Sequence, residues 1–119
     1  LEDDTAEDTK AWVAAQNEVT FAYLRQIPFR DRLRDRLTQL VNYPRISAPD
    51  VKHHWRLFTR NDGLQNQAVY YLQDGDDGEP FVLLDPNTMS EDGTTRVAGL
   101  TFDAAGTRIA YMVSGAGSD

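Results

Sequence analysis

Side chains that could do covalent chemistry are sparse in this chain. A serine hydrolase needs a nucleophile on a tight elbow, and the elbow sequence Gly-x-Ser-x-Gly does not occur in the 119 residues. The nearest candidates, Ser114 and Ser118, lie in a tail of small residues. His53 and His54 are adjacent, so on a strand they would point to opposite faces, and in a turn they would be exposed polar residues. We therefore assign no catalytic, substrate-binding or metal-ligating residue, and we expect no cofactor.

One acidic run could bind a cation. Residues 74–79 read Asp-Gly-Asp-Asp-Gly-Glu, and Asp85 follows at the twelfth position of a possible calcium loop. Its glycine stands at the fifth position instead of the sixth, Asp replaces the final Glu, and the flanking segments resemble strands. A hairpin loop is therefore the preferred interpretation, and a calcium site is the alternative.

Charge argues against a nucleic-acid partner. The formal net charge is −7, and residues 61–95 contain no Lys or Arg. Residues 30–36 carry four arginines, but Asp31 and Asp35 are interleaved with them, which favours a salt-bridged face over a phosphate or RNA patch.

The absence of cysteine excludes disulfides and thiolate chemistry and is compatible with a reducing compartment. We expect a cytoplasmic protein, or a periplasmic one if a bacterial leader was removed. No apolar run approaches the ~20 residues of a membrane span, so we expect no membrane partner.

Two helices are predicted at the start. Thr5 and Asp8 have the spacing of a capping box, and the first helix should cover residues 10–26 and end at Ile27, because Pro28 follows. The second helix should begin at Pro28 and stop at Tyr43 and Pro44. Apolar residues recur at three- and four-residue steps in both: Trp12, Ala15, Val19, Ala22, Tyr23 and Ile27, then Phe29, Leu33, Leu37, Leu40 and Val41. This apolar surface exceeds what two helices can hide between themselves, so a further partner is expected.

An antiparallel meander should follow. Residues 55–60, 68–73 and 81–84 are rich in β-branched and aromatic residues and are separated by Gly, Asp and Asn clusters. A short extended segment at residues 45–50 precedes them, and residues 97–102 and 108–114 read as a second hairpin. We expect four aromatic residues to serve in core or inter-blade packing instead of binding a ligand: Trp12, Trp55, Tyr70 and Tyr71.

The β region also repeats. Leu57 and Phe58 correspond to Ala110 and Tyr111 at an offset of about 53 residues, which is in the range of four-stranded propeller blades. The repeat predicts that more blades follow and that the sequence stops inside the second one.

Longer strings resemble the N-terminal part of the prolyl oligopeptidase family from end to end. They are residues 10–17 (Lys-Ala-Trp-Val-Ala-Ala-Gln-Asn), 26–30 (Gln-Ile-Pro-Phe-Arg), 61–67 (Asn-Asp-Gly-Leu-Gln-Asn-Gln), 84–87, 90–94 and 114–119 (Ser-Gly-Ala-Gly-Ser-Asp). The sequence departs from the family pattern in two turns, at His53 and His54 and at residues 103–106.

The resemblance implies an α+β fragment of a serine endopeptidase that cleaves short peptides after proline. The parent protein would combine a seven-bladed β-propeller with an α/β-hydrolase domain that carries the Ser/Asp/His triad. Residues 1–42 would be helices that dock on the peptidase domain, and residues 43–119 would be the first blade and half of the second. The expected partners are the remainder of the same polypeptide and short proline-containing peptides.

On this reading the segment is structural, helps to control substrate access and is itself inactive. The alternative is a non-catalytic propeller-type binding module. In either case the half-finished blade should leave a strand edge open beside Ile109, Tyr111 and Val113, so we expect the isolated chain to self-associate or fold poorly.

Overall fold

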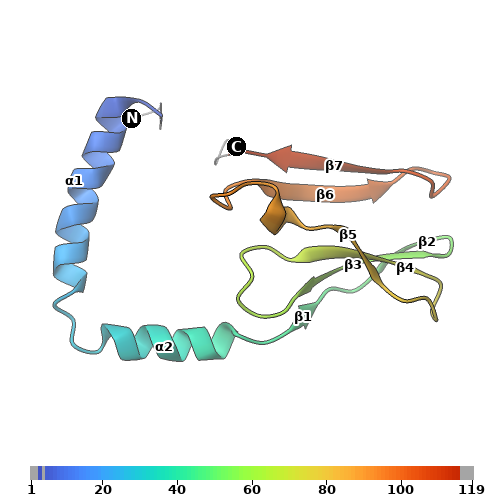
Figure 1. Ribbon diagram of the computed structural model, residues 1–119, viewed down its shortest axis with the longest axis horizontal. Helices are drawn as coiled ribbons and strands as arrows, with labels where there is room; N and C mark the ends of the chain where they lie inside the picture. The colour runs from blue at the N-terminus through green and yellow to red at the C-terminus, as the bar shows by residue number, and fades with distance from the viewer. Residues whose placement is uncertain (1–2, 4, 116–119) are drawn as a thin grey trace. The chain divides into compact units, whose positions relative to one another are not determined.

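The computed structural model describes residue 3 and residues 5–115. The chain divides into two compact units, Leu1–Leu40 and Val41–Asp119, and each is considered by itself. The first contains helix α1 (Glu7–Leu24) and nearly all of helix α2 (Arg30–Val41), and the second contains all the strands (Figure 1).

The start of α1 differs from the predicted capping box. The helix begins at Glu7 with Ala6 as its N-cap, and no side chain caps it. Thr5 instead turns back, and its backbone N–H and hydroxyl both donate to Asp3 Oδ1, at 2.9 and 2.6 Å. The capping-box prediction is therefore wrong, because Asp3 competes successfully for the Thr5 hydroxyl.

The end of α1 also comes earlier than expected. The helix stops at Leu24 instead of continuing to Ile27, and the next amides bond three residues back: Gln26 N–H to the Tyr23 carbonyl and Ile27 N–H to that of Leu24. Pro28 disfavours helical geometry at Ile27, and the last turn tightens before the chain leaves it.

No residue of α1 or α2 is buried. The predicted α2 stripe is helical but solvent-facing, with exposures of 46–54% for Phe29, Leu33, Leu37, Leu40 and Val41. Trp12, expected in core packing, is 52% exposed, because the two helices do not bury their apolar stripes against each other. The predicted salt-bridged face is confirmed, since Arg34 pairs with Asp31 at 3.2 Å and with Asp35 at 3.6 Å.

The meander is confirmed as an antiparallel sheet. β3 (Trp55–Asn61), β4 (Val69–Asp74) and β5 (Phe81–Leu84) pair in sequence order. β1 (Arg45–Ile46) and β2 (Asp50–Lys52) both pair with the other edge of β3, so together they act as one interrupted strand. The result is a sheet that is four strands wide.

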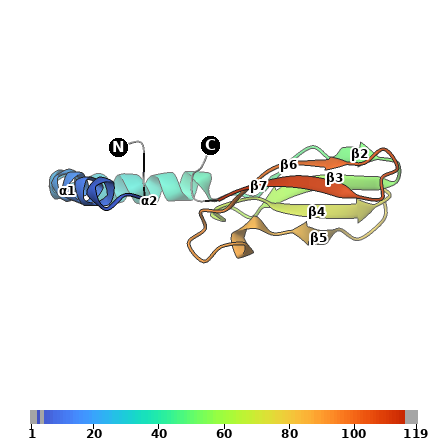
Figure 2. The ribbon, with the colours of Figure 1, turned by 90° about the horizontal axis from the view of Figure 1, so that it is seen from above.

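β6 (Arg96–Phe102) and β7 (Ile109–Ser114) form the predicted hairpin, which lies against the sheet (Figures 1 and 2). The two turns that correspond in the repeat share a backbone feature. His53 (φ 54°) and Gly106 (φ 69°) both adopt the left-handed conformation and lie 53 positions apart. The histidine therefore occupies a position where glycine would normally be preferred.

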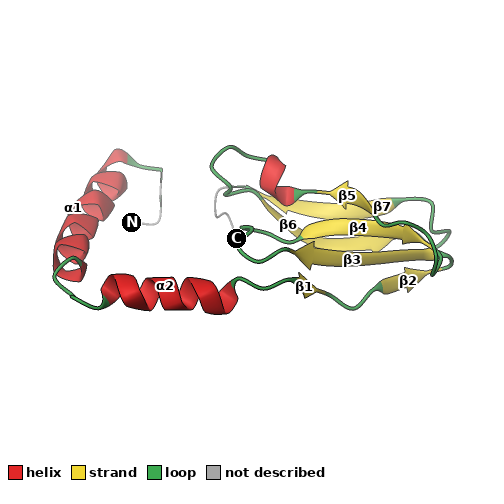
Figure 3. Cartoon of the chain, turned by 60° about the horizontal axis from the view of Figure 1, so that its bottom comes forward, coloured by secondary structure: helices red, strands yellow, loops and turns green. Residues whose placement is uncertain are grey.

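The core belongs to this second unit. Leu57 and Leu72 face each other across β3 and β4 and are 6% and 7% exposed, and Val69 and Val97 are equally buried. The strands run nearly alongside one another, so the connections gather at two ends (Figure 3). The loop end holds residues 62–68 and 85–95, including the 3-10 helix η1 (Pro86–Thr88), and the turn end holds the turns β2–β3, β4–β5 and β6–β7.

Candidate functional site

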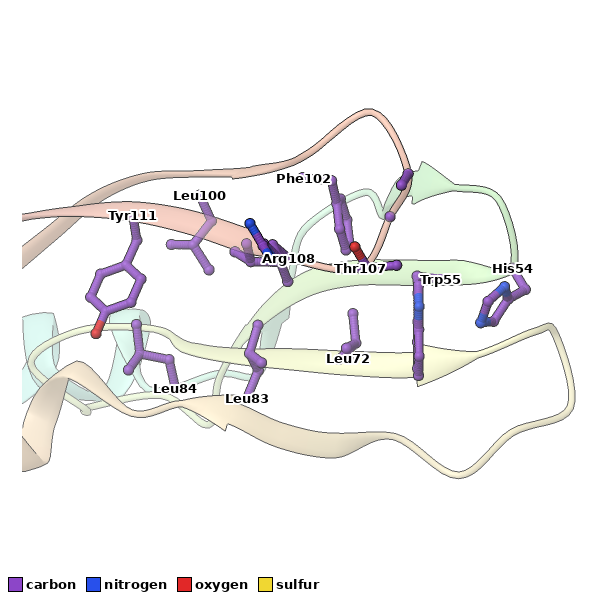
Figure 4. A pocket seen from close by; sticks show the side chains of 13 residues that line it. His54, Trp55, Leu72, Leu83, Leu84, Leu100, Phe102, Thr107, Arg108 and Tyr111 are labelled. Atoms are coloured by element: carbon purple, nitrogen blue, oxygen red, sulfur yellow. The ribbon is translucent and has the colours of Figure 1, made fainter.

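A hollow lies between the sheet and the β6–β7 hairpin. It has a volume of about 700 Å³, and Figure 4 shows side chains from both elements pointing into it. Trp55 and Leu72 line it from the sheet, and Leu100, Phe102 and Tyr111 line it from the hairpin. The Trp55 indole also meets the Phe81 ring edge-on, with centroids 6.5 Å apart.

The lining is suited to packing and not to bond chemistry. His54, Thr107 and Arg108 line it beside the turn end, and most of its other lining side chains are apolar. Trp55 lines this hollow, and its ring contact with Phe81 is packing within the sheet. Tyr71 stacks on Phe58 with centroids 5.7 Å apart, so it too packs within the sheet.

At the loop end, a set of side-chain amides joins one loop to the next. The Asn87 side chain closes a pair of bonds with the Gln67 backbone: its Oδ1 accepts from Gln67 N–H at 2.9 Å, and its Nδ2 donates to the Gln67 carbonyl at 3.0 Å. Asp85 Oδ1 accepts from the Asn87 side chain at 2.8 Å and caps η1 through Asn87 N–H. The two loops are thereby fixed side by side.

The same loop reaches the start of the hairpin. Gln67 Nε2 donates to the Thr95 carbonyl at 2.5 Å, and Asn66 Nδ2 donates to the Gly93 carbonyl at 2.9 Å. Sequence reasoning singled out these strings only as a family resemblance. The available signal was their content of Asn and Gln immediately after strands, where such side chains can replace missing backbone partners.

At the turn end, the two histidines have separate partners. His53 Nε2 lies 3.3 Å from the Ala104 carbonyl in the hairpin turn. The His54 ring lies against that of Trp55, tilted by 40° with centroids 4.7 Å apart, and His54 Nε2 lies 3.8 Å from Asp74 Oδ1. His53 therefore links the β2–β3 turn to the β6–β7 turn, whereas His54 contacts residues of β3 and β4. The two rings do not face a common site.

The acidic run is a hairpin turn, as preferred. The Asp76 carboxylate pairs with Arg56, and the Asp76 backbone carbonyl accepts a hydrogen bond from Gln73 Nε2 at 2.9 Å. Asp85, the proposed twelfth ligand, is engaged with Asn87. Within residues 3 and 5–115, no group of three or more His, Asp or Glu side chains could hold a metal ion.

Among the described residues, three aspartates have a lowered pKa. In Asp103, hydrogen bonding from the Arg108 amide lowers the pKa most, and Thr107 adds to it; both amides donate to Oδ1, at 3.1 and 2.8 Å. Bonds from Thr5 lower the pKa of Asp3, and bonds from Thr94 lower that of Asp92. All three carboxylates accept hydrogen bonds from residues that follow within five positions, so they order turns.

The two serines singled out from the sequence differ in whether the structure describes them. Ser114 ends β7 opposite Arg96, and Ser118 lies outside the described residues. Of the helices within residues 3 and 5–115, none combines the length and apolarity that crossing a membrane requires.

Comparison with known proteins gives one consistent answer. The family model described as "Prolyl oligopeptidase, N-terminal beta-propeller domain" matches residues 1–119. The chain is 51% identical over its whole length to a prolyl endopeptidase of Elizabethkingia meningoseptica and 34% identical to a dual function macrocyclase-peptidase of Galerina marginata. It spans 17% and 18% of these relatives.

Solved structures agree. One, from a study of two prolyl endopeptidases and the role of inter-domain dynamics in their catalysis and specificity, matches with a TM-score of 0.85 at 28% identity, covering 96% of this chain and 17% of that one. Prolyl oligopeptidase B from Galerina marginata, bound to a 35mer substrate, matches with a TM-score of 0.80 at 29% identity, covering 97% and 18%. The apo form of that enzyme matches with a TM-score of 0.58 at the same identity and coverage.

Proposed function

The chain belongs to the prolyl oligopeptidase family, and from this we propose that it is the N-terminal part of a serine endopeptidase that cleaves short peptides on the C-terminal side of proline. The supporting observation is the match of residues 1–119 to the family model, together with 51% identity to a prolyl endopeptidase. Because this chain spans 17% of that relative, the catalytic groups would come from the remaining sequence.

Within the complete enzyme, the second unit would begin the propeller. β1 and β2, then β3, β4 and β5, would form the first four-stranded blade, and β6–β7 would open the second. The cavity lined by Trp55, Leu72 and Tyr111 would then lie between blades. Its apolar lining supports a role in blade packing.

Residues 1–42 would dock on the peptidase domain. The support is the exposed apolar stripe of α2, which a helix normally buries against a neighbour. The partners would thus be the remainder of the polypeptide and, for the complete enzyme, short proline-containing peptides.

The function is tested by comparing two proteins on a Gly-Pro reporter amide: the 119-residue chain and the complete polypeptide. We expect turnover by the complete protein and none by the chain. Turnover by the chain alone would refute its non-catalytic role. A complete protein that binds proline peptides without cleaving them would favour the binding-module alternative.

The docking role is tested separately in the complete protein. Leu37→Asp places a charge in the apolar stripe, and Thr38→Asp places the same charge one residue further along α2, on a different face. We expect Leu37→Asp to lower the thermal stability and the turnover, with little effect from Thr38→Asp. Equal effects of the two substitutions would argue against a docking face centred on Leu37.

A further inference from the structure

Arg45 anchors the first residues of the sheet unit to the end of β3 and to the loop that follows it. After α2 ends at Val41, the chain reaches β1, which pairs with β3 at only two positions. So short a strand supplies few backbone bonds, and side chains must add to them. Arg45 Nη2 donates to Asn61 Oδ1 at 3.2 Å and to the Gly63 carbonyl at 2.9 Å.

Arg45 also contacts the linker that precedes it. Its guanidinium lies 5.6 Å from the centroid of the Tyr43 ring, a cation–π arrangement. Pro44, between the two, has a fixed φ and restricts the residue before it. We call Tyr43, Arg45, Asn61 and Gly63 the Arg45 cluster.

The acceptor in this cluster is itself immobilised. Asn61 is 7% exposed; its Oδ1 also accepts from Gly63 N–H at 2.9 Å, and its Nδ2 donates to the Gln65 carbonyl at 2.9 Å. Because both ends of the amide are used, it cannot rotate to follow a displaced arginine without losing bonds. The position of Arg45 and the conformation of the following loop are therefore fixed together.

The first linker residue also lies close to this loop. A Cβ placed on Gly63 would lie 2.1 Å from Asn42 Oδ1 and 3.4 Å from the Asn42 backbone carbonyl carbon, so the Asn42 side chain lies against this loop and would have to move to admit a larger residue at Gly63. Gly63 has a φ of 139°, which other residues rarely adopt.

From here the contacts continue to the hairpin. The loop that Arg45 holds ends in Gln67, which bonds to Asn87 and to the carbonyl of Thr95, next to the start of β6. One connected set of contacts thus runs from the linker to the hairpin.

We propose that Arg45 is a positioning residue that fixes the direction of the linker and thereby helps to determine which lengths of peptide substrate reach the active site of the complete enzyme. This inference rests on the proposed function. Loss of the cluster would free the linker and the loop 62–67. The cleavage rate of long peptides would then rise most, because their access depends most on how far the propeller and the peptidase domain of the complete enzyme can separate.

The test uses the complete protein with three variants. Arg45→Met removes the donors and keeps an apolar stem, and Arg45→Lys keeps one charge that can reach one acceptor. Arg56→Met is the matched control, because Arg56 likewise donates to a backbone carbonyl, that of His54 at 3.1 Å, and pairs with Asp76, but at the turn end.

Each variant is assayed on the Gly-Pro reporter amide and on a proline-containing peptide of 35 residues, the length bound in the Galerina structure. For Arg45→Met we expect the long-to-short ratio of kcat/KM to rise about fivefold, which is at the lower end of coupling between linked sites. The ratio for Arg45→Lys should lie between those of the unaltered protein and Arg45→Met. Arg56→Met should leave the ratio unchanged. A substitution that only destabilised the protein would lower kcat/KM equally for both substrates.

Hydrogen exchange of residues 41–46 and 61–67 supplies a readout that does not depend on activity. Faster exchange in Arg45→Met, partly restored in Arg45→Lys, is expected. If Arg45→Met fails to fold, the ratio and exchange of Arg45→Lys decide the question. An unchanged ratio, or unchanged exchange, in a folded Arg45 variant would overturn the proposal. If the unaltered protein cleaves neither substrate, the proposed function fails, whereas exchange still reports on the cluster.

Discussion

The helical unit and the sheet unit use their apolar residues in opposite ways. α1 and α2 bury none of theirs, although both are regular helices. The sheet unit buries Leu57, Val69, Leu72 and Val97, which come from β3, β4 and β6. A helix completes its backbone bonds locally and can form with its stripe unpartnered, whereas a strand needs a partner distant in sequence. The helical unit is therefore the part of this chain most dependent on a surface outside it.

The largest expected effect comes from truncating one leucine in each unit. In the 119-residue chain, Leu57→Ala should lower the local stability of β3 and β4 by about 2–5 kcal/mol, because it leaves a cavity opposite Leu72. Leu37→Ala should cost about 0.5 kcal/mol there, since Leu37 is 53% exposed. Hydrogen exchange measures both.

The same pair in the complete protein sharpens the comparison. If α2 docks on a peptidase domain, the cost of Leu37→Ala should rise toward that of a core leucine. A cost as small in the complete protein as in the chain would mean that this stripe remains solvent-exposed.

A second test compares amide side chains. Asn61 is buried and makes bonds at both ends of its amide, so Asn61→Ala should cost about 1–3 kcal/mol and speed exchange in residues 61–67. Gln39 accepts one long bond, 3.5 Å, from Arg36 on the exposed surface of α2, so Gln39→Ala should have little effect. Similar losses of stability in the two variants would show that the burial of Asn61 adds nothing to the free energy of unfolding.

The third test concerns self-association of the isolated chain. Among the described strands, β7 pairs only with β6, so its other edge is open. Val113→Lys should raise the dissociation constant about tenfold, or 1.4 kcal/mol, because charge on an edge strand opposes pairing between chains. Val19→Lys makes the same change on α1, where Val19 is 70% exposed.

Sedimentation of both variants at several concentrations provides the measurement. The smaller effect is expected for Val19→Lys, because helix stripes associate without forming a backbone ladder. A larger effect of Val19→Lys would assign the association to the helices, and a fully monomeric unaltered chain would remove the basis for the prediction.

Much of the fold could be predicted from local chemistry. Gly, Asp and Asn clusters gave the boundaries of β3, β4 and β5 to within one residue, because turn residues act through their own backbone preferences. The ends of α1 were predicted less well. There, Asp3 and Pro28 competed with helix geometry over a few residues, and the outcome depends on small differences between alternative bonds.

Contacts between distant residues were harder to predict. The cavity residue Trp55 was correctly expected to pack, but nothing in the spacing of Arg45 and Asn61 indicates that they meet. That contact depends on the pairing of β1 with the end of β3, which is a property of the sheet. The exposure of Trp12 was missed because a periodic stripe predicts that a partner is needed, not where the partner comes from.

The smallest expected effect concerns two turns with ionised aspartates, one in each unit. The pKa of Asp103 is lowered, first by the Arg108 amide, so its stabilisation is complete above the ordinary aspartate pKa of about 3.9 and is lost as the pH falls through the lower value in the folded protein. The amide signals of Thr107 and Arg108, which both donate to Asp103, should titrate together below about pH 3.9.

Asp3 is the counterpart in the helical unit, where bonds from Thr5 lower the pKa. Its protonation should affect only the turn before α1, because its hydrogen-bond partners among the described residues, Thr5 and Ala6, lie within three residues. Protonation of Asp103 should instead speed hydrogen exchange in β6 and β7, since this turn sets their register. Asp103→Asn should abolish the titration of the Thr107 amide, and a midpoint at or above the ordinary aspartate value would contradict the role of these hydrogen bonds.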